Sequence, residues 1–252
     1  MPIDRVEFLG VEFDIFSEHQ VIDRLGLVTA ETPFSYIVTP NVDHVVRLNG
    51  VETEPGLGAA YASADLCVCD SRVLALLARF RGIRLPVVTG SDLTAVLLQK
   101  VLVRGDRVAI VGGTVELVRR LSGLYSHVEF VHHCPPMGLR RDTAAQTAAA
   151  AFIAQAKCRF TFLAVGSPQQ ELIAARVKGG TGCGLCIGAA LEFLTGDQVR
   201  APKLLRRTGL EWAYRLASNP GRLWRRYLIE GPQVFLLAWR WRGPRAGDGR
   251  RA

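Results

Sequence analysis

The sequence predicts an α/β fold: a Rossmann-like, mostly parallel sheet with helices on both faces, followed by a C-terminal helical appendage. Short apolar runs rich in β-branched and aromatic residues alternate with segments of helical period over most of the 252 residues. The basic charge is segregated, because 13 of the 31 Lys and Arg but only 3 of the 23 Asp and Glu lie from Arg200 onward. We therefore expect a catalytic core over 1–199, a basic amphipathic appendage over 200–242 and a disordered tail over 243–252.

The first half of the chain begins with an alternating segment around Gly10, which is typical of a small hairpin. Pro40 ends the first core strand, and Asn41 or Asp43 can cap the helix after it. The predicted elements are a hairpin over 6–16, strands over 34–39 and 65–69, and helices over 18–28, 42–49, 55–64, 71–80 and 92–103.

The second half continues the same alternation without an internal repeat or linker. A glycine turn closes the strand VAIVGG, and Pro168 stands in the first turn of a helix, where its missing N–H does no harm. The predicted elements are strands over 107–113, 127–133 and 159–166, helices over 115–125, 144–156 and 168–177, and a strand followed by a helix over 184–196.

Composition and the chain ends narrow the class of protein. Hydrophobic residues make up 49% of the chain, which is typical of a globular protein. The segment MPIDRVEFLG carries acids where a secretory signal would be basic, and the apolar run VFLLAW is far too short to span a bilayer. We expect a cytoplasmic protein that associates peripherally with the inner face of the cell membrane. The six cysteines show no repeated zinc spacing, and we expect them to be reduced core residues.

Polar residues follow four of the predicted strands, at the edge where parallel α/β sheets bind ligands. They lie in the segments TPN (39–41), CDS (69–71), VGGT (111–114) and VGSPQQE (165–171). Asp70 is the leading candidate, because a carboxylate that faces the cleft can remove a proton from a bound hydroxyl. Asp70 could instead cap the helix after it, but Ser71 can take that role.

The other three segments each have a structural explanation beside a functional one. Thr39 and Asn41 can bind sugar hydroxyls, or they can form an ordinary turn. Gly112 can approach a nucleotide, or it can serve a tight turn. The third glycine of the dinucleotide fingerprint is absent, which disfavours an NAD-dependent oxidoreductase.

The segment VGSPQQE places Gln170 and Glu171 at the start of a helix, where backbone N–H groups favour anions. Both side chains are candidates for substrate binding. The structural alternative is an ordinary helix start that Ser167 caps. The sequence alone leaves both explanations open.

Together with the basic tail, these segments form a recognisable set. TPNVDHVV is similar to a T-x-N segment, ADLCVCDSRVLALLARFRGIRLPVVTGSDL to an A-D-x-x-x-x-D block that ends in G-x-D-L, and VGSPQQE to a G-x-P-x-Q-E motif. The segment RAPKLLRRTGLEWAYRLASNPGRLWRRYL is the most specific, and it is similar to the signature R-A-P, G-x-E-W-x-x-R-L, P-x-R-x-x-R-Y. Nearly end to end, the chain resembles the WecG/TagA/CpsF glycosyltransferases, which elongate lipid-linked sugars in bacterial polysaccharide synthesis. Ser71 stands where that family usually has glycine.

The resemblance implies an enzyme that moves a sugar from a UDP-sugar to a polyprenyl-pyrophosphate-linked acceptor of cell-envelope or exopolysaccharide synthesis. Donors in the family include N-acetylmannosamine, uronic acids and related sugars, and the sequence chooses neither the donor nor the polymer. Asp70 would be the general base of an inverting transfer. The resemblance implies a substrate-binding role for six further residues, which are Thr39, Asn41, Gln170, Arg215, Arg222 and Arg225.

No metal or other cofactor is expected. A D-x-D pair at a strand end is missing from the sequence, and arginines can neutralise a departing diphosphate in place of a metal. Arg215, Arg222 and Arg225 are spaced by seven and then three residues, which would place them on one face of a continuous helix, although Pro220 interrupts it.

The remaining tail residues predict an anionic membrane surface as a further partner. Trp224, Tyr227, Trp239 and Trp241 can sit at the headgroup level, while VFLLAW enters the acyl boundary. The structural alternative is a helix over 210–216 packed on the core. The functional alternatives are a nucleic-acid-binding protein and a non-catalytic interaction protein that uses the basic tail. We expect no nucleic acid partner, and homo-oligomer formation stays open.

Overall fold

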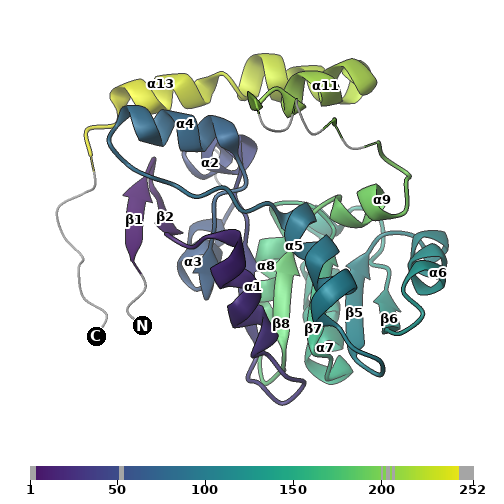
Figure 1. The fold of residues 1–252 in the computed structure, drawn as a ribbon. Coiled ribbons are helices and arrows are strands. Elements are labelled where there is room, and N and C mark those ends of the chain that lie inside the picture. The colour runs from purple at the N-terminus through teal and green to yellow at the C-terminus, as the bar shows by residue number, and fades with distance from the viewer. Residues whose placement is uncertain (1–3, 51–53, 200, 203–204, 206–207, 244–252) are drawn as a thin grey trace.

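The computed structural model describes residues 4–50, 54–199, 201–202, 205 and 208–243, and for Arg222 the backbone alone. Within this part of the chain, six strands form one parallel sheet in the order β4-β3-β8-β7-β5-β6 (Figure 1). Their bounds are β3 Ser35–Val38, β4 Leu66–Cys67, β5 Arg107–Gly112, β6 Glu129–His133, β7 Phe160–Ala164 and β8 Cys183–Cys186. The predicted α/β class is confirmed.

Helices cover both faces of the sheet, because successive strand residues point into two separate cores. Val38 and Leu163 belong to the first core, while Ile37 and Phe162 belong to the second. The first core lies under α2 (Val42–Leu48), α3 (Leu57–Ala62), α4 (Arg72–Phe80), α7 (Thr143–Ala156) and α8 (Gln169–Arg176). The second lies under α1 (Glu18–Gly26), α5 (Gly90–Val96), the π-helix η1 (Leu97–Val101), α6 (Val115–Leu124) and α9 (Ala190–Leu194). A short 3₁₀ turn, η2, spans Leu139–Arg141.

The predicted hairpin is present as β1 (Arg5–Phe8) and β2 (Val11–Asp14), with a two-residue turn at Leu9 and Gly10. Both turn residues have positive φ, 53° and 74°, as a type I′ turn requires. The Asp14 carboxylate, which is fully buried, accepts hydrogen bonds from Arg5 Nε at 2.6 Å and from the backbone N–H of Cys67 at 2.7 Å. The hairpin is thereby attached to the edge strand β4.

The cysteines are core residues as expected, except Cys134, which is exposed after β6. Five of the six are buried and all are free thiols. Cys67 and Cys69 share one core, as their spacing predicts, whereas Cys183 and Cys186 face opposite cores. The C-x-x-C pair is therefore accounted for by strand packing.

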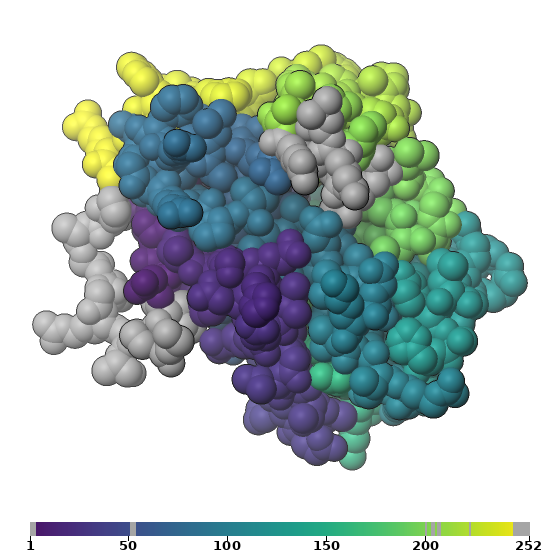
Figure 2. All heavy atoms as spheres, in the orientation of Figure 1, coloured from purple at the N-terminus to yellow at the C-terminus, as the bar shows by residue number. Residues whose placement is uncertain are grey.

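The C-terminal appendage consists of α11 (Glu211–Ser218), α12 (Pro220–Trp224), the π-helix η3 (Arg225–Glu230) and α13 (Gln233–Arg240). It lies as one layer over the end of the core that carries α2 and α4 (Figure 1), and the space-filling view shows it seated against that end (Figure 2). No helix among the described residues is both long enough and apolar enough to span a bilayer.

The appendage is anchored to the core through α13. Val234 and Ala238 are buried in the first core, while α11 and η3 bury no residue. Arg81, just after α4, donates from Nη2 to the carbonyl oxygens of Ala238 at 2.9 Å, of Trp239 at 3.4 Å and of Trp241. These contacts satisfy carbonyls at a helix end that has no intrahelical donors for them.

Residues of the segment 210–216 are partly buried or exposed, and α13 is the helix of the appendage with residues in the first core. Trp241, expected at a membrane surface, packs edge-on against Phe8 at 5.2 Å and donates from Nε1 to Glu7 Oε1 at 3.2 Å. The expected place of Trp241 is therefore wrong, because its ring lies against the hairpin. Apart from Gly243, the expected tail over 243–252 lies outside the described residues.

Candidate active site

Asp70 lies just beyond β4, at the carboxyl edge of the sheet. Its backbone N–H donates to the Pro40 carbonyl oxygen at 3.0 Å, which continues the pairing of β4 with β3. Ser71 caps α4, because its Oγ accepts the backbone N–H of Leu74 at 3.2 Å. Asp70 is thus free of the capping role. Ser71 has an extended backbone with φ −159°, a conformation that any residue adopts, so the position does not require glycine.

The Asp70 carboxylate meets two other segments at this edge. The backbone N–H of Gly90, at the start of α5, donates to Asp70 Oδ2 at 3.2 Å. A Cβ atom on Gly90 would lie only 3.1 Å from Thr39 Oγ1 and 3.9 Å from Asp70 Oδ2. Thr39 is buried, and its hydroxyl donates to the Cys186 carbonyl oxygen at 3.3 Å. The structure therefore brings Thr39 and Asp70 together around a glycine that the sequence analysis did not select.

Burial is the largest influence on Asp70 and raises the pKa of its carboxyl from 3.8 to about 7. The Gly90 N–H and the positive charge of Arg215 act in the opposite direction, while the negative charges of Glu211 and Asp92 raise the pKa further. A carboxyl that titrates near neutral pH is well matched to general-base chemistry, since both protonation states are accessible there.

Asn41 caps α2, so its predicted capping role is confirmed over that of Asp43. Its Oδ1 accepts the backbone N–H of Asp43 at 3.0 Å, and its own backbone N–H donates to His44 Nδ1 at 3.1 Å. Burial lowers the pKa of His44, and the negative charge of Glu171 partly offsets that effect. His44, which sequence reasoning missed, thus connects two of the candidate residues.

Gln170 and Glu171 lie inside the protein at the start of α8. Gln170 Oε1 accepts the backbone N–H of Gly188 at 3.0 Å, and its Nε2 donates to Glu171 Oε1 at 2.9 Å. The same carboxylate oxygen accepts from Tyr61 Oη at 3.4 Å and lies 3.8 Å from His44 Nε2. Glu171 is 1% exposed. Gln170 is 3% exposed, so both side chains are buried, and their substrate-binding roles stay predictions.

The other structural explanations have mixed outcomes. Ser167 does not cap α8, because the helix has no side-chain cap and Ser167 Oγ has no hydrogen-bond partner among the described residues. Gly112 has φ +99°, and a Cβ there would lie 2.7 Å from Val165 Cγ1 and 2.8 Å from the Ala164 carbonyl oxygen. Close packing of β5 against β7 therefore suffices to require glycine at position 112, and its nucleotide-binding role stays a prediction.

The appendage brings Arg215 to the Asp70 side of the site. Its Nη2 donates to Glu211 Oε1 at 2.6 Å, its guanidinium lies 4.9 Å from the Phe193 ring centroid, and its charge acts on Asp70. Arg225 is exposed on η3. The side chain of Arg222 lies outside the described part of the chain. Of the two predicted arginines whose side chains are described, Arg215 is the one whose charge acts on Asp70.

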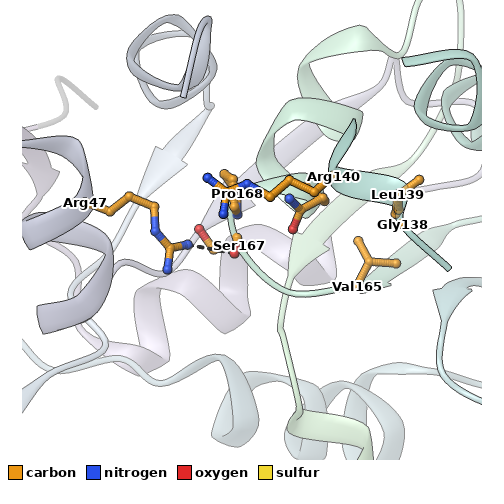
Figure 3. A pocket seen from close by; sticks show the side chains of 8 residues that line it. Arg47, Gly138, Leu139, Arg140, Val165, Ser167 and Pro168 are labelled. Atoms are coloured by element: carbon orange, nitrogen blue, oxygen red, sulfur yellow. Dashed lines mark hydrogen bonds between the residues drawn. The ribbon is translucent and has the colours of Figure 1, made fainter. Parts of the chain in front are cut away.

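A separate cavity of about 330 Å³ opens at the end of β7 (Figure 3). Arg47 Nη1 donates to the Ser167 carbonyl oxygen at 2.7 Å on one side, and Arg140 pairs with Glu54 at 2.9 Å on the other. None of the predicted site residues lines this cavity, although it borders the segment that leads into Gln170. Its lining residues are Arg47, Gly138, Leu139, Arg140, Val165, Ser167, Pro168 and Gln169.

The carboxyl edge of the parallel sheet thus carries a buried carboxyl with a raised pKa, and the positive charge of Arg215 from the appendage acts on it. The sequence model of the glycosyl transferase WecG/TagA/CpsF family matches residues 6–247. The chain belongs to this family and is a glycosyltransferase.

A curated relative from Bacillus spizizenii has a named activity. It is called N-acetylglucosaminyldiphosphoundecaprenol N-acetyl-beta-D-mannosaminyltransferase, and it is 26% identical to this chain over 234 residues. The similarity covers 90% of this chain and 86% of the relative. Both the sheet and the appendage fall within the family match.

Proposed function

We propose that the enzyme transfers N-acetylmannosamine or a related sugar from a UDP-sugar to a sugar carried on polyprenyl pyrophosphate. The name of the Bacillus relative supports this acceptor class and this donor sugar. The observation that carries the proposal is the Asp70 carboxyl, which lies near Thr39 at the sheet edge. Burial raises the pKa of this carboxyl to about 7, and the positive charge of Arg215 acts on it. An acid of this kind suits proton removal from a sugar hydroxyl at neutral pH.

In the proposed reaction, Asp70 accepts the proton of an acceptor hydroxyl while that oxygen forms a bond to the anomeric carbon of the donor. The bond from the anomeric carbon to the diphosphate oxygen breaks, and UDP leaves with the electron pair. Attack opposite the leaving group inverts the anomeric centre. The beta linkage in the name of the relative agrees with inversion of an α-linked nucleotide sugar.

The negative charge that develops on UDP needs compensation. Arg215 is placed for this role, since it lies close enough to Asp70 to lower the pKa of its carboxyl. In this proposal Arg222 and Arg225 extend the cationic surface from the appendage, and Thr39, Asn41 and Gln170 bind the sugars. The chemistry asks for no metal, because guanidinium groups supply the positive charge.

The lipid-linked acceptor places the reaction at a bilayer, and the appendage offers a surface for it. Large apolar side chains remain exposed there within the most basic part of the sequence. Such a surface suits anionic headgroups and the acyl boundary beneath them. The exposed side chains are Leu210, Trp212, Trp224, Leu228, Ile229, Phe235, Leu236 and Trp239.

A panel of UDP-sugars against a polyprenyl-pyrophosphate-linked N-acetylglucosamine analogue tests the proposal, with UDP release as the readout. We expect acceptor-dependent UDP release with one amino sugar or uronic acid donor, and its loss in Asp70→Asn. Failure of every donor with the folded wild-type enzyme would overturn the proposed donor and acceptor classes. Release that persists in Asp70→Asn would overturn the role of the base.

A further inference from the structure

The first turn of α2 links the candidate sugar site to the appendage. Asn41 is held there by two hydrogen bonds, from Asp43 N–H to its Oδ1 at 3.0 Å and from its own N–H to His44 Nδ1 at 3.1 Å. The orientation of the Asn41 side-chain amide therefore depends on the position of Asp43, and the position of the Asn41 backbone depends on His44. Glu171 steadies His44 from the core side, with its Oε1 3.8 Å from His44 Nε2.

From the other side, Asp43 is held by the appendage. Arg226, in η3, places its Nη2 at 3.3 Å from Asp43 Oδ2, and Arg47 places its Nη2 at 3.2 Å from the same oxygen. The Asp43 side chain is 14% exposed and that of Arg226 is 36% exposed, so the ion pair is partly shielded from water. No residue of α11 or η3 is fully buried, and this ion pair attaches η3 to α2.

We propose that Arg226 and Asp43 are positioning residues that couple docking of the appendage to the orientation of Asn41. When Arg226 is docked, Asp43 is fixed between two guanidinium groups, and its backbone N–H holds the Asn41 side chain. The same docking brings Arg215 next to Asp70. One movement therefore completes both halves of the site. The inference rests on the proposed function where it treats Asn41 as a sugar-binding residue.

Sequence reasoning selected Arg222 and Arg225 from this segment and did not select Arg226. The structure separates the adjacent arginines, because Arg225 is exposed to solvent while Arg226 turns toward α2. Arg226 therefore has a partner in the protein itself, which fits a residue that acts through Asp43.

A double-mutant cycle in the full-length enzyme tests the coupling. The variants are Arg226→Ala, Asp43→Asn and the double variant, with Arg226→Lys as the conservative exchange and Arg104→Ala, an exposed arginine beyond η1, as the control. We expect each of the single variants Arg226→Ala and Asp43→Asn to lose on the order of tenfold in kcat/KM with a soluble acceptor analogue. The double variant should lose no more than the less active of these two. Arg226→Lys should recover part of the loss, and Arg104→Ala should match wild type.

Hydrogen exchange supplies a readout that needs no substrate. The N–H groups of Asn41 and Asp43 make the bonds in question, so peptides over 41–48 should exchange faster in Arg226→Ala together with peptides over 211–230. Faster exchange over 211–230 alone, or losses that multiply to about a hundredfold in the double variant, would overturn the coupling. If no UDP-sugar is turned over by wild type, the proposed function fails, while the exchange pattern still decides the coupling.

Discussion

The sheet edge that carries Asp70 and the appendage that faces it are held in place by different forces. The edge belongs to two apolar cores, in which Val38 and Phe162, one from each core, are fully buried. In α11 and η3 no residue is fully buried, and η3 makes the ion pair Arg226–Asp43 with α2. Apolar packing keeps its geometry across salt and pH, whereas partly exposed ion pairs respond to both. The core therefore fixes Asp70, the proposed base, while the position of the arginines in the appendage can depend on salt and pH.

The largest expected effect comes from a substitution of Asp70 at the sheet edge. Asp70→Asn should lower kcat by about 10³-fold, since general-base catalysis typically contributes 10²–10⁴-fold. It should also stabilise the fold above neutral pH. The folded state raises the pKa of Asp70 from 3.8 to about 7, so its ionisation between these values costs folding free energy. Ionisation of Asp70 in the folded state therefore lowers the free energy of unfolding by at most about 4 kcal/mol.

Two measurements check this pair of effects. UDP release gives kcat, and thermal unfolding at pH 5 and pH 8 gives the change in stability. We expect the stabilisation by asparagine to be larger at pH 8, where wild-type Asp70 is ionised. Equal unfolding midpoints of the two proteins at pH 8 would contradict the raised pKa, and a kcat within tenfold of wild type would contradict the catalytic role.

A neighbouring pair of residues in α13 distinguishes anchoring to the core from the proposed membrane contact. Val234 is 1% exposed in the first core, whereas Phe235 is 56% exposed. Val234→Asp should destabilise the protein by about 2–4 kcal/mol, because it places a carboxyl in an apolar site. Phe235→Asp should change stability by less than about 0.5 kcal/mol, but weaken binding to vesicles of anionic lipid.

Denaturant unfolding and vesicle co-sedimentation distinguish the two variants. If both lose stability equally, the division of α13 into a buried and an exposed face is wrong. If Phe235→Asp binds anionic vesicles as wild type does, this face of the appendage is not the membrane contact. Neutral vesicles serve as the lipid control.

Sequence patterns predicted the fold well because apolar alternation and helix caps are local signals. The alternation of strands and helices, the hairpin at Gly10 and the caps at Asn41 and Ser71 all follow from residues close in the chain. The position of α13 was missed, since its partners Phe8 and Arg81 lie far away in sequence. Contacts between such distant segments leave no periodic signal.

In the candidate site, too, local features could be predicted and contacts between distant segments could not. Asp70 could be selected because a strand end is a local feature, and its chemistry follows from the residue type. The groups that tune it could not be selected in that way: the Gly90 N–H and the charges of Glu211 and Arg215 come from separate segments. Gly90 and Glu211 do lie in the G-x-D-L and G-x-E-W motifs, so the motifs carried a signal without revealing their roles.

Salt should affect the two regions differently, with a smaller expected effect than the substitutions above. Raising ionic strength from about 0.05 M to about 0.5 M shortens the screening length to a few ångströms and weakens exposed ion pairs. We expect hydrogen exchange over 211–230 to accelerate severalfold, while peptides in β5 and β7 stay unchanged. Equal protection of the appendage at both salt concentrations would show that apolar contacts, and not charges, hold it.

The smallest expected effect is a shift in the pH dependence of activity, and its sign distinguishes the two charged residues of α11. Because Asp70 must be deprotonated to act as a base, kcat/KM should fall as the pH drops through about 7. Glu211 raises the pKa of Asp70, so Glu211→Gln should move the acidic limb of the profile to lower pH. Arg215 lowers that pKa, so Arg215→Ala should move the limb to higher pH, in addition to any loss of rate.

The opposite directions are what make this comparison informative. A loss of folding or docking would move both profiles the same way, or lower activity without moving either. A direct charge effect on Asp70 moves them apart, because both side chains act on the one carboxyl. Profiles of kcat/KM from pH 5 to 9 therefore test whether the appendage, which little apolar burial holds in place, sets the protonation of a base that the core fixes.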